Sequence, residues 1–164
     1  MDTPSVISNS VLFSSLSDEQ RYQLSSIAKT CSYPNGYTVF KQGDTITDLY
    51  EIRSGRIQLV TEMKLWNQDW TLHSQVESLG TGDIFGWSSL IEPNIATLSA
   101  YTIEPCSIDV INGREVWKLL DADPLMGYKV MSALARLISR RLEAIRKSTA
   151  SAKSQEISKM ALGT

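Results

Sequence analysis

Short segments of alternating polarity, separated by glycines between residues 37 and 111, constrain the fold of this chain more than any other feature. Gly43, Gly55 and Gly82 follow or separate these segments, at turns whose backbone conformations glycine adopts freely. The expected strands cover 37–40, 49–53, 56–60, 71–79, 97–102 and 107–111. Short strands at this spacing are typical of a sandwich, roll or barrel, so the fold class is predicted to be mainly β with flanking helices.

Three further local patterns lie in the N-terminal half. Ser17 and Gln20 stand at capping-box spacing, and the apolar face that follows predicts a helix over 18–29. The dipeptide Ser54-Gly55 lies between two strands as a hairpin turn. A second hairpin tip is expected at 66–70.

The C-terminal part is predicted to be helical. Asn112 opens a capping box for a short helix, and Asp123 then precedes a long helix over 124–148. Apolar residues recur on one side of that helix at Val130, Met131, Leu134, Leu137, Ile138, Leu142 and Ile145. The helix is longer than a compact β domain needs, and the simplest surface for its lower half is a second copy of the chain. We therefore expect a homodimer.

The expected organisation has three parts. Residues 1–123 hold the N-terminal helix, the β region and the short helix, 124–148 form the dimerisation helix, and 149–164 form a basic tail. Residues 136–164 carry 7 basic and 2 acidic side chains, whereas the rest of the chain carries 9 and 16. This asymmetry indicates either an interaction surface near the C-terminus or a tail that folds over the acidic body. A helix with a solvated basic face explains it as well.

The sequence contains little that would indicate a catalytic site or a metal site. The single histidine, His73, has no cysteine or carboxylate at ligand spacing, and Cys31 and Cys106 are far apart. No nucleophile motif accompanies His73, so we expect no enzyme. The chain has neither an apolar run of about 18 residues nor a signal-peptide pattern, which favours a cytoplasmic protein without membrane contact.

Three motifs together carry a resemblance to a known family. They are YTVFKQGD at 37–44, LYEIRSGRI at 49–57 and GDIFG at 82–86. In this order the chain resembles the cyclic nucleotide-binding domain of catabolite-activator and fumarate-nitrate-reductase-type regulators, kinase regulatory subunits and gated channels. The resemblance implies a double-stranded β-helix, a jelly-roll-like β-roll, with an N-terminal helix, a short helix and a long C-terminal helix. It also implies a bound cyclic nucleotide, cyclic AMP or cyclic GMP.

The resemblance places a candidate pocket after the third motif. A brief helical turn near Trp87 would direct backbone N–H groups and a positive dipole end toward a phosphate, and Gly86 would permit close approach. The hydroxyls of Ser88 and Ser89 would add donors. The candidate pocket residues are Phe85, Gly86, Trp87, Ser88, Ser89, Asn94, Ile95, Ala96 and Thr97.

Two of these positions depart from the family pattern. Trp87 stands where nucleotide-binding members carry the Glu that accepts the ribose hydroxyl, and Asn94 stands where they carry the Arg that pairs with the phosphate. Losing both should weaken cyclic nucleotide binding by roughly two to four orders of magnitude. Trp87 either lines a pocket remodelled for a less charged small ligand or fills the vacated space. Asn94 is either a weak phosphate donor or an ordinary turn residue after Pro93.

The functional expectation follows from these departures. We expect a stand-alone sensor or regulatory domain with weak or lost cyclic AMP and cyclic GMP binding, which signals to a separate, unknown protein partner. The 16 residues after Ser148 are too few for a helix-turn-helix domain, so DNA binding is not expected. The alternative is a ligand-free adaptor that uses the same fold for protein contacts.

Overall fold

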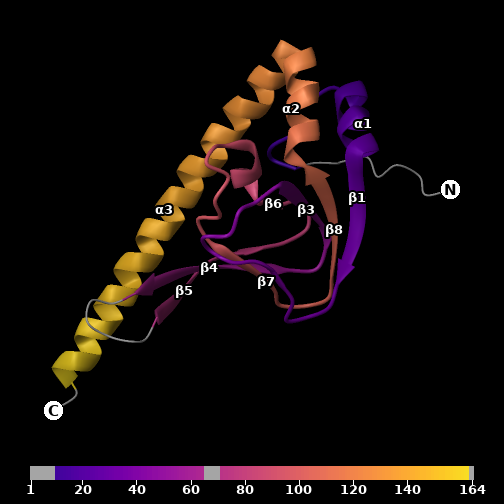
Figure 1. The fold of residues 1–164 in the computed structure, drawn as a ribbon. Coiled ribbons are helices and arrows are strands. Elements are labelled where there is room, and N and C mark those ends of the chain that lie inside the picture. The colour runs from indigo at the N-terminus through magenta and orange to yellow at the C-terminus, as the bar shows by residue number, and fades with distance from the viewer. Residues whose placement is uncertain (1–9, 65–70, 163–164) are drawn as a thin grey trace.

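Two antiparallel sheets form the body of the computed structural model, which describes residues 10–64 and 71–162 (Figure 1). The first sheet has the order β1 (Ala28–Tyr33), β8 (Cys106–Asn112), β3 (Asp48–Ser54), β6 (Ile84–Phe85). The second has the order β2 (Thr38–Phe40), β7 (Ser99–Thr102), β4 (Ile57–Lys64), β5 (Thr71–Leu79). The helices are α1 (Asp18–Ile27), the 3-10 turn η1 (Trp87–Leu90), α2 (Gly113–Ala122) and α3 (Pro124–Leu162). The predicted class, mainly β with flanking helices, is confirmed.

The strand predictions agree closely with these elements. β4 and β5 pair antiparallel from Ile57 with Leu79 to Lys64 with Thr71. The hairpin tip expected at 66–70 lies outside the described residues. The turn at Ser54-Gly55 does join β3 and β4, and a Cβ on Gly55 would meet the carbonyl oxygen of Pro105 at 2.5 Å.

The first helix ends earlier than its sequence pattern predicts. The capping box at Ser17 is present, with the hydroxyl accepting from the Gln20 N–H. However, Ala28 and Lys29, expected in the helix, begin β1 and pair with Ile111 and Val110 of β8. The sequence pattern predicts no strand here, because the pairing partner lies about 80 residues away and leaves no local signal.

The last helix is longer than expected. The helix predicted to end near Ser148 continues to Leu162 as part of α3, which has 39 residues. Residues 149–162 contain neither glycine nor proline, so nothing in the chain terminates the helix. α3 runs diagonally along one side of both sheets and beyond them (Figure 1).

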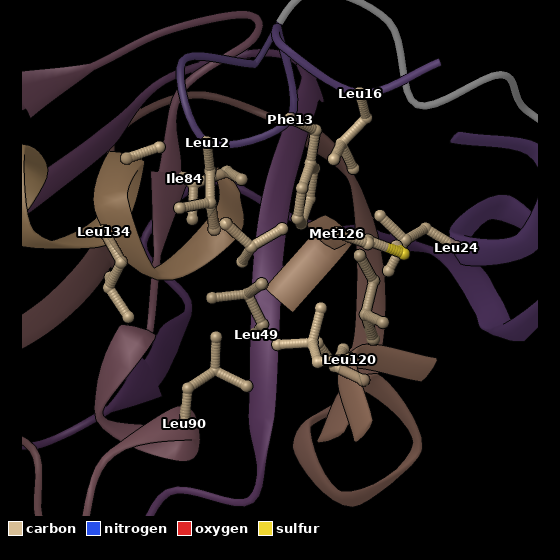
Figure 2. Close-up of a cluster of buried hydrophobic side chains, with 14 of the residues drawn as sticks. Leu12, Phe13, Leu16, Leu24, Leu49, Ile84, Leu90, Leu120, Met126 and Leu134 are labelled. Atoms are coloured by element: carbon tan, nitrogen blue, oxygen red, sulfur yellow. The ribbon is translucent and has the colours of Figure 1, made fainter. Parts of the chain in front are cut away.

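The buried side chains form two clusters, one on each face of the first sheet. The outer cluster joins that sheet to the helices. Figure 2 shows Leu49 of β3 among Leu120 of α2, Met126 of α3 and Leu90 of η1. The inner cluster fills the space between the two sheets, which together form the β-roll. It contains Phe85, whose ring stacks on Tyr50 with centroids 4.9 Å apart.

Candidate ligand pocket

The turn after β6 has the tight geometry that its glycine permits. Gly86 has φ +74°, and a Cβ there would lie 2.6 Å from the ring of Tyr50 and 2.9 Å from the carbonyl oxygen of Asp48. The hydroxyl and the N–H of Ser89 both donate to the Gly86 carbonyl, at 2.8 and 3.0 Å. The Ser89 hydroxyl proton is therefore committed to the protein backbone.

Asn94 closes the same turn from the other side. Its Nδ2 donates to the carbonyl oxygens of Ser88 at 2.9 Å and Ser89 at 3.2 Å. Its backbone is left-handed, with φ 62°, and its carbonyl accepts from the Ile46 N–H at 2.7 Å. Both amide protons thus bond to η1, and in this arrangement neither is directed at a ligand.

η1 is one 3-10 turn of four residues, at the place where a brief helical turn was expected. Its end is tied to the helices by Trp117 of α2, whose Nε1 donates to the Leu90 carbonyl at 3.1 Å. Trp87, half-buried, packs against the outer cluster. The turn therefore connects the interior of the β-roll with the helical layer.

A small cavity lies inside the β-roll beside this turn. Its walls combine residues of both sheets, η1 and α3, namely Phe40, Ile46, Leu59, Phe85, Gly86, Trp87, Ser88, Ala96, Thr97, Leu98 and Arg141. Its volume is about 20 Å³, which leaves room for about one water molecule.

The structure brings together most, but not all, of the predicted pocket residues. Phe85, Gly86, Trp87, Ser88, Ala96 and Thr97 line the cavity. Ser89 and Asn94 are not among the lining residues, and they make the hydrogen bonds described above. Ile95 is exposed and forms an isolated bridge with Thr45.

Five lining residues were not predicted from the sequence, namely Phe40, Ile46, Leu59, Leu98 and Arg141, and of these only Arg141 is charged. It comes from α3, and its side chain is only 3% exposed. Nη1 lies 2.5 Å from Oε2 of Glu77 on β5, and burial lowers the pKa of the guanidinium, against the opposing effect of Glu77. A sequence signal did exist: Arg141 follows Leu134 and Leu137 at helical spacing, so it occupies a position on the buried side of α3.

Within residues 10–64 and 71–162, no group of three or more His, Cys, Asp or Glu side chains is arranged to hold a metal ion. No helix in the described part of the chain is long and apolar enough to cross a membrane.

Known proteins that are similar to this chain are cyclic nucleotide-binding proteins. The model of the family "Cyclic nucleotide-binding domain" matches residues 30–123. The chain is 30% identical over 127 residues to the "Cyclic AMP receptor protein" of Thermus thermophilus, a match that covers 77% of this chain. It spans only 56% of the length of that relative.

Solved structures agree with this family match. A putative cyclic nucleotide-binding protein from Geobacter metallireducens superposes with a TM-score of 0.69 at 28% identity, over 87% of this chain and 99% of that one. A cyclic nucleotide-binding domain from Methylobacillus flagellatus superposes with a TM-score of 0.72 at 21% identity, over 90% and 81% of the two chains. The second likeness concerns the fold alone.

Proposed function

The chain belongs to the cyclic nucleotide-binding domain family, and from this premise we propose that it is a sensor domain in which cyclic AMP and cyclic GMP bind weakly or not at all. Its role is regulatory and not catalytic. The main observation in support of this proposal is the small volume of the pocket. About 20 Å³ is available inside the β-roll, whereas pockets for ligands of this size usually measure about 300 Å³ or more.

The contacts of the two unusual positions support this proposal. Asn94 bonds its amide to Ser88 and Ser89, so a phosphate would have to break those bonds to reach it. Trp87 offers an indole where the family pattern has a carboxylate acceptor for the ribose. Both differences remove a charged partner of the nucleotide, and hydrogen bonds to charged groups are stronger than those between neutral groups.

A signal from this pocket has a physical route to the long helix. η1 lines the cavity, Trp117 of α2 bonds to the last residue of η1, and α2 leads directly into α3. Through this bond, we expect a movement of η1 to displace the helical layer. A ligand shifts this equilibrium only if it binds the two arrangements with different affinity.

We further propose that α3 carries the output, as a homodimerisation surface over 124–148 and as a contact for a separate partner protein near its basic C-terminal part. Exposed apolar side chains along α3 support this, at Leu125, Tyr128, Leu142, Ile157, Met160 and Leu162. In this division, residues 1–123 form the sensing part.

Thermal unfolding with cyclic AMP and cyclic GMP, each at about 1 mM, tests the proposal. We expect no rise in Tm beyond that caused by 5′-AMP at the same concentration. A ligand at 100 times its Kd would add roughly 2.7 kcal/mol, several degrees in a domain of this size. A shift of that size with either cyclic nucleotide would refute the proposed loss of binding.

The small size of the cavity also favours a second candidate, a ligand-free adaptor. In that case α3 would contact its partner in one fixed arrangement. Hydrogen exchange of α3 distinguishes the two: a sensor exchanges α3 amides differently once its ligand is added, whereas an adaptor shows the same pattern with every small molecule tried.

A further inference from the structure

A second cavity lies outside the β-roll, between the N-terminal segment, the turn before β6 and α3. Its volume is about 140 Å³, whereas the cavity inside the β-roll measures about 20 Å³. A cavity of about 10–15 Å³ already holds a water, so this one has room for a small organic molecule. Part of its wall is apolar, with Leu12 and Ile84 of the outer cluster and Leu137 of α3 (Figure 2).

The rest of the wall is charged. It carries two acidic side chains, Glu77 and Asp83, and two basic ones, Arg140 and Arg141. Glu77 and Arg141 neutralise each other, because Oε2 of Glu77 lies 2.5 Å from Nη1 of Arg141. Asp83 also raises the pKa of Arg141, without forming an ion pair with it. Among the described residues, neither Asp83 nor Arg140 takes part in a salt bridge, so this cavity offers a ligand one carboxylate and one guanidinium.

The two groups differ in how firmly they are placed. Asp83 is fixed in the turn before β6, since its Oδ2 accepts from the Gly80 N–H at 2.9 Å and its carbonyl accepts from the Ile52 N–H at 3.0 Å. A carboxylate has about four lone-pair sites, so Asp83 can accept further hydrogen bonds. Arg140 is exposed on α3, and its long side chain keeps rotational freedom to adjust to a ligand.

A molecule that carries both charges complements this arrangement. An ammonium group donates hydrogen bonds to a carboxylate, and the planar fork of a guanidinium fits the two oxygens of a carboxylate. An α-amino acid has both groups on one carbon atom. A purely anionic ligand would be repelled by Asp83, and a purely cationic one by Arg140, so the pair of side chains favours a zwitterion over either.

We propose that this cavity binds a small aliphatic α-amino acid, whose carboxylate pairs with Arg140 and whose ammonium group pairs with Asp83. The side chain of the ligand packs against the apolar wall formed by Leu12, Ile84 and Leu137. The site is separate from the cavity inside the β-roll, and it goes beyond the proposed function because it gives the domain a second ligand of different chemistry.

The first test is calorimetric titration of the full chain with L-valine at about pH 7, where both charged groups of the amino acid are largely ionised. Two analogues each lack one charge: N-acetyl-L-valine has no ammonium group, and L-valinamide has no carboxylate. We expect saturable binding of L-valine and binding of either analogue that is at least about tenfold weaker. Equal affinity for L-valine and one analogue would overturn the proposal, as would the lack of saturable binding up to about 50 mM.

Variants provide the second test. Asp83→Asn retains an oxygen that can accept from the Gly80 N–H but removes the charge, and Arg140→Gln removes the guanidinium. Each should weaken L-valine binding about tenfold or more. Arg136→Gln is the matched control, because Arg136 is exposed one turn earlier on α3 and does not line the cavity. Solutes excluded from protein surfaces stabilise many proteins, so an equal rise in Tm with L-valine in all four proteins would reveal such a general effect and refute the proposal.

Should Asp83→Asn fail to fold, Arg140→Gln and the two analogues still decide the matter. The two proposals also fail separately. Stabilisation by cyclic AMP refutes the proposed weak nucleotide binding, whatever L-valine does. A chain that binds no L-valine refutes only the present inference.

Discussion

The indole Nε1 of Trp117 donates a 3.1 Å hydrogen bond to the carbonyl oxygen of Leu90, and this bond fastens α2 to the last residue of η1. Leu90 itself is buried in the outer cluster (Figure 2). The contact joins an element of the pocket wall to the helical layer across 27 residues of sequence. It is therefore a sensitive place to test whether η1 and the helices move together.

Trp117→Phe keeps the aromatic packing but leaves the Leu90 carbonyl without this donor. We expect a loss of about 1 kcal/mol in the free energy of unfolding, the usual value for one neutral hydrogen bond. Amide exchange in Trp87–Leu90 should become faster. Denaturant unfolding and hydrogen exchange measure the two effects, with Lys118→Ala on the exposed side of α2 as the matched control. Unchanged exchange in η1 would show that the bond does not restrain the turn.

Asn94 combines a left-handed backbone with two hydrogen bonds to η1, and two variants separate these contributions. Asn94→Gly keeps the backbone conformation and should cost about 1–2 kcal/mol through the lost hydrogen bonds. Asn94→Ala should cost about 1 kcal/mol more, because a Cβ without a compensating amide disfavours positive φ. Urea denaturation gives both values. If the two variants are equally stable, the backbone conformation contributes nothing measurable.

Glu51 makes stability depend on pH. Burial, together with the nearby Asp109 carboxylate, raises the pKa of Glu51 from 4.5 to about 8, against the opposing charge of Arg53. Because the folded state holds this proton more tightly than the unfolded state, the contribution of Glu51 to stability is largest below pH 4.5. It falls as pH rises from 4.5 toward 8 and is constant above that.

Glu51→Gln should remove this dependence. The variant is expected to be more stable than the unaltered protein at about pH 9, by on the order of 2 kcal/mol, and to differ little from it at pH 4.5. Urea denaturation at a series of pH values checks the slope. Parallel curves for the two proteins would show that the pKa of Glu51 is the same in the folded and the unfolded state.

Leu142, 56% exposed on α3, tests the proposed dimer. Leu142→Asp places a charge on the apolar surface and should convert a dimer, of twice the 18.3 kDa chain mass, into a monomer. Light scattering coupled to size exclusion measures the mass. Lys147→Asp introduces the same carboxylate on another side of the helix and should leave the dimer intact. A monomeric unaltered chain would contradict the proposal directly.

Much of the fold could be predicted from local patterns. Alternating segments bounded by Gly43, Gly55 and Gly82 placed most strands within a few residues, because the two-residue period and the turns are properties of the local chain. β1 and the two-residue β6 were not predicted. The residues of β1 follow a helical segment without a break, and only their pairing with β8 makes them a strand.

The candidate site, too, could be predicted only in part. The family resemblance placed Gly86 before a brief helical turn, and it showed that Trp87 and Asn94 differ from the family pattern. Local patterns could not show that the Asn94 amide is bonded to η1, because that depends on how the turn closes. They also placed Arg141 on a helix without indicating what that side of the helix would meet.

By itself, the sequence therefore determined the periods, caps and turns, since hydrophobic alternation and glycine conformations act over a few residues. Tertiary structure alone decided which of those elements share a site. It brought Arg141 of α3 against Glu77 of β5 and into a cavity closed by Phe85 and Trp87. The physical reason is that burial and charge pairing depend on residues far apart in the chain, whose distances are fixed only when the sheets and helices pack.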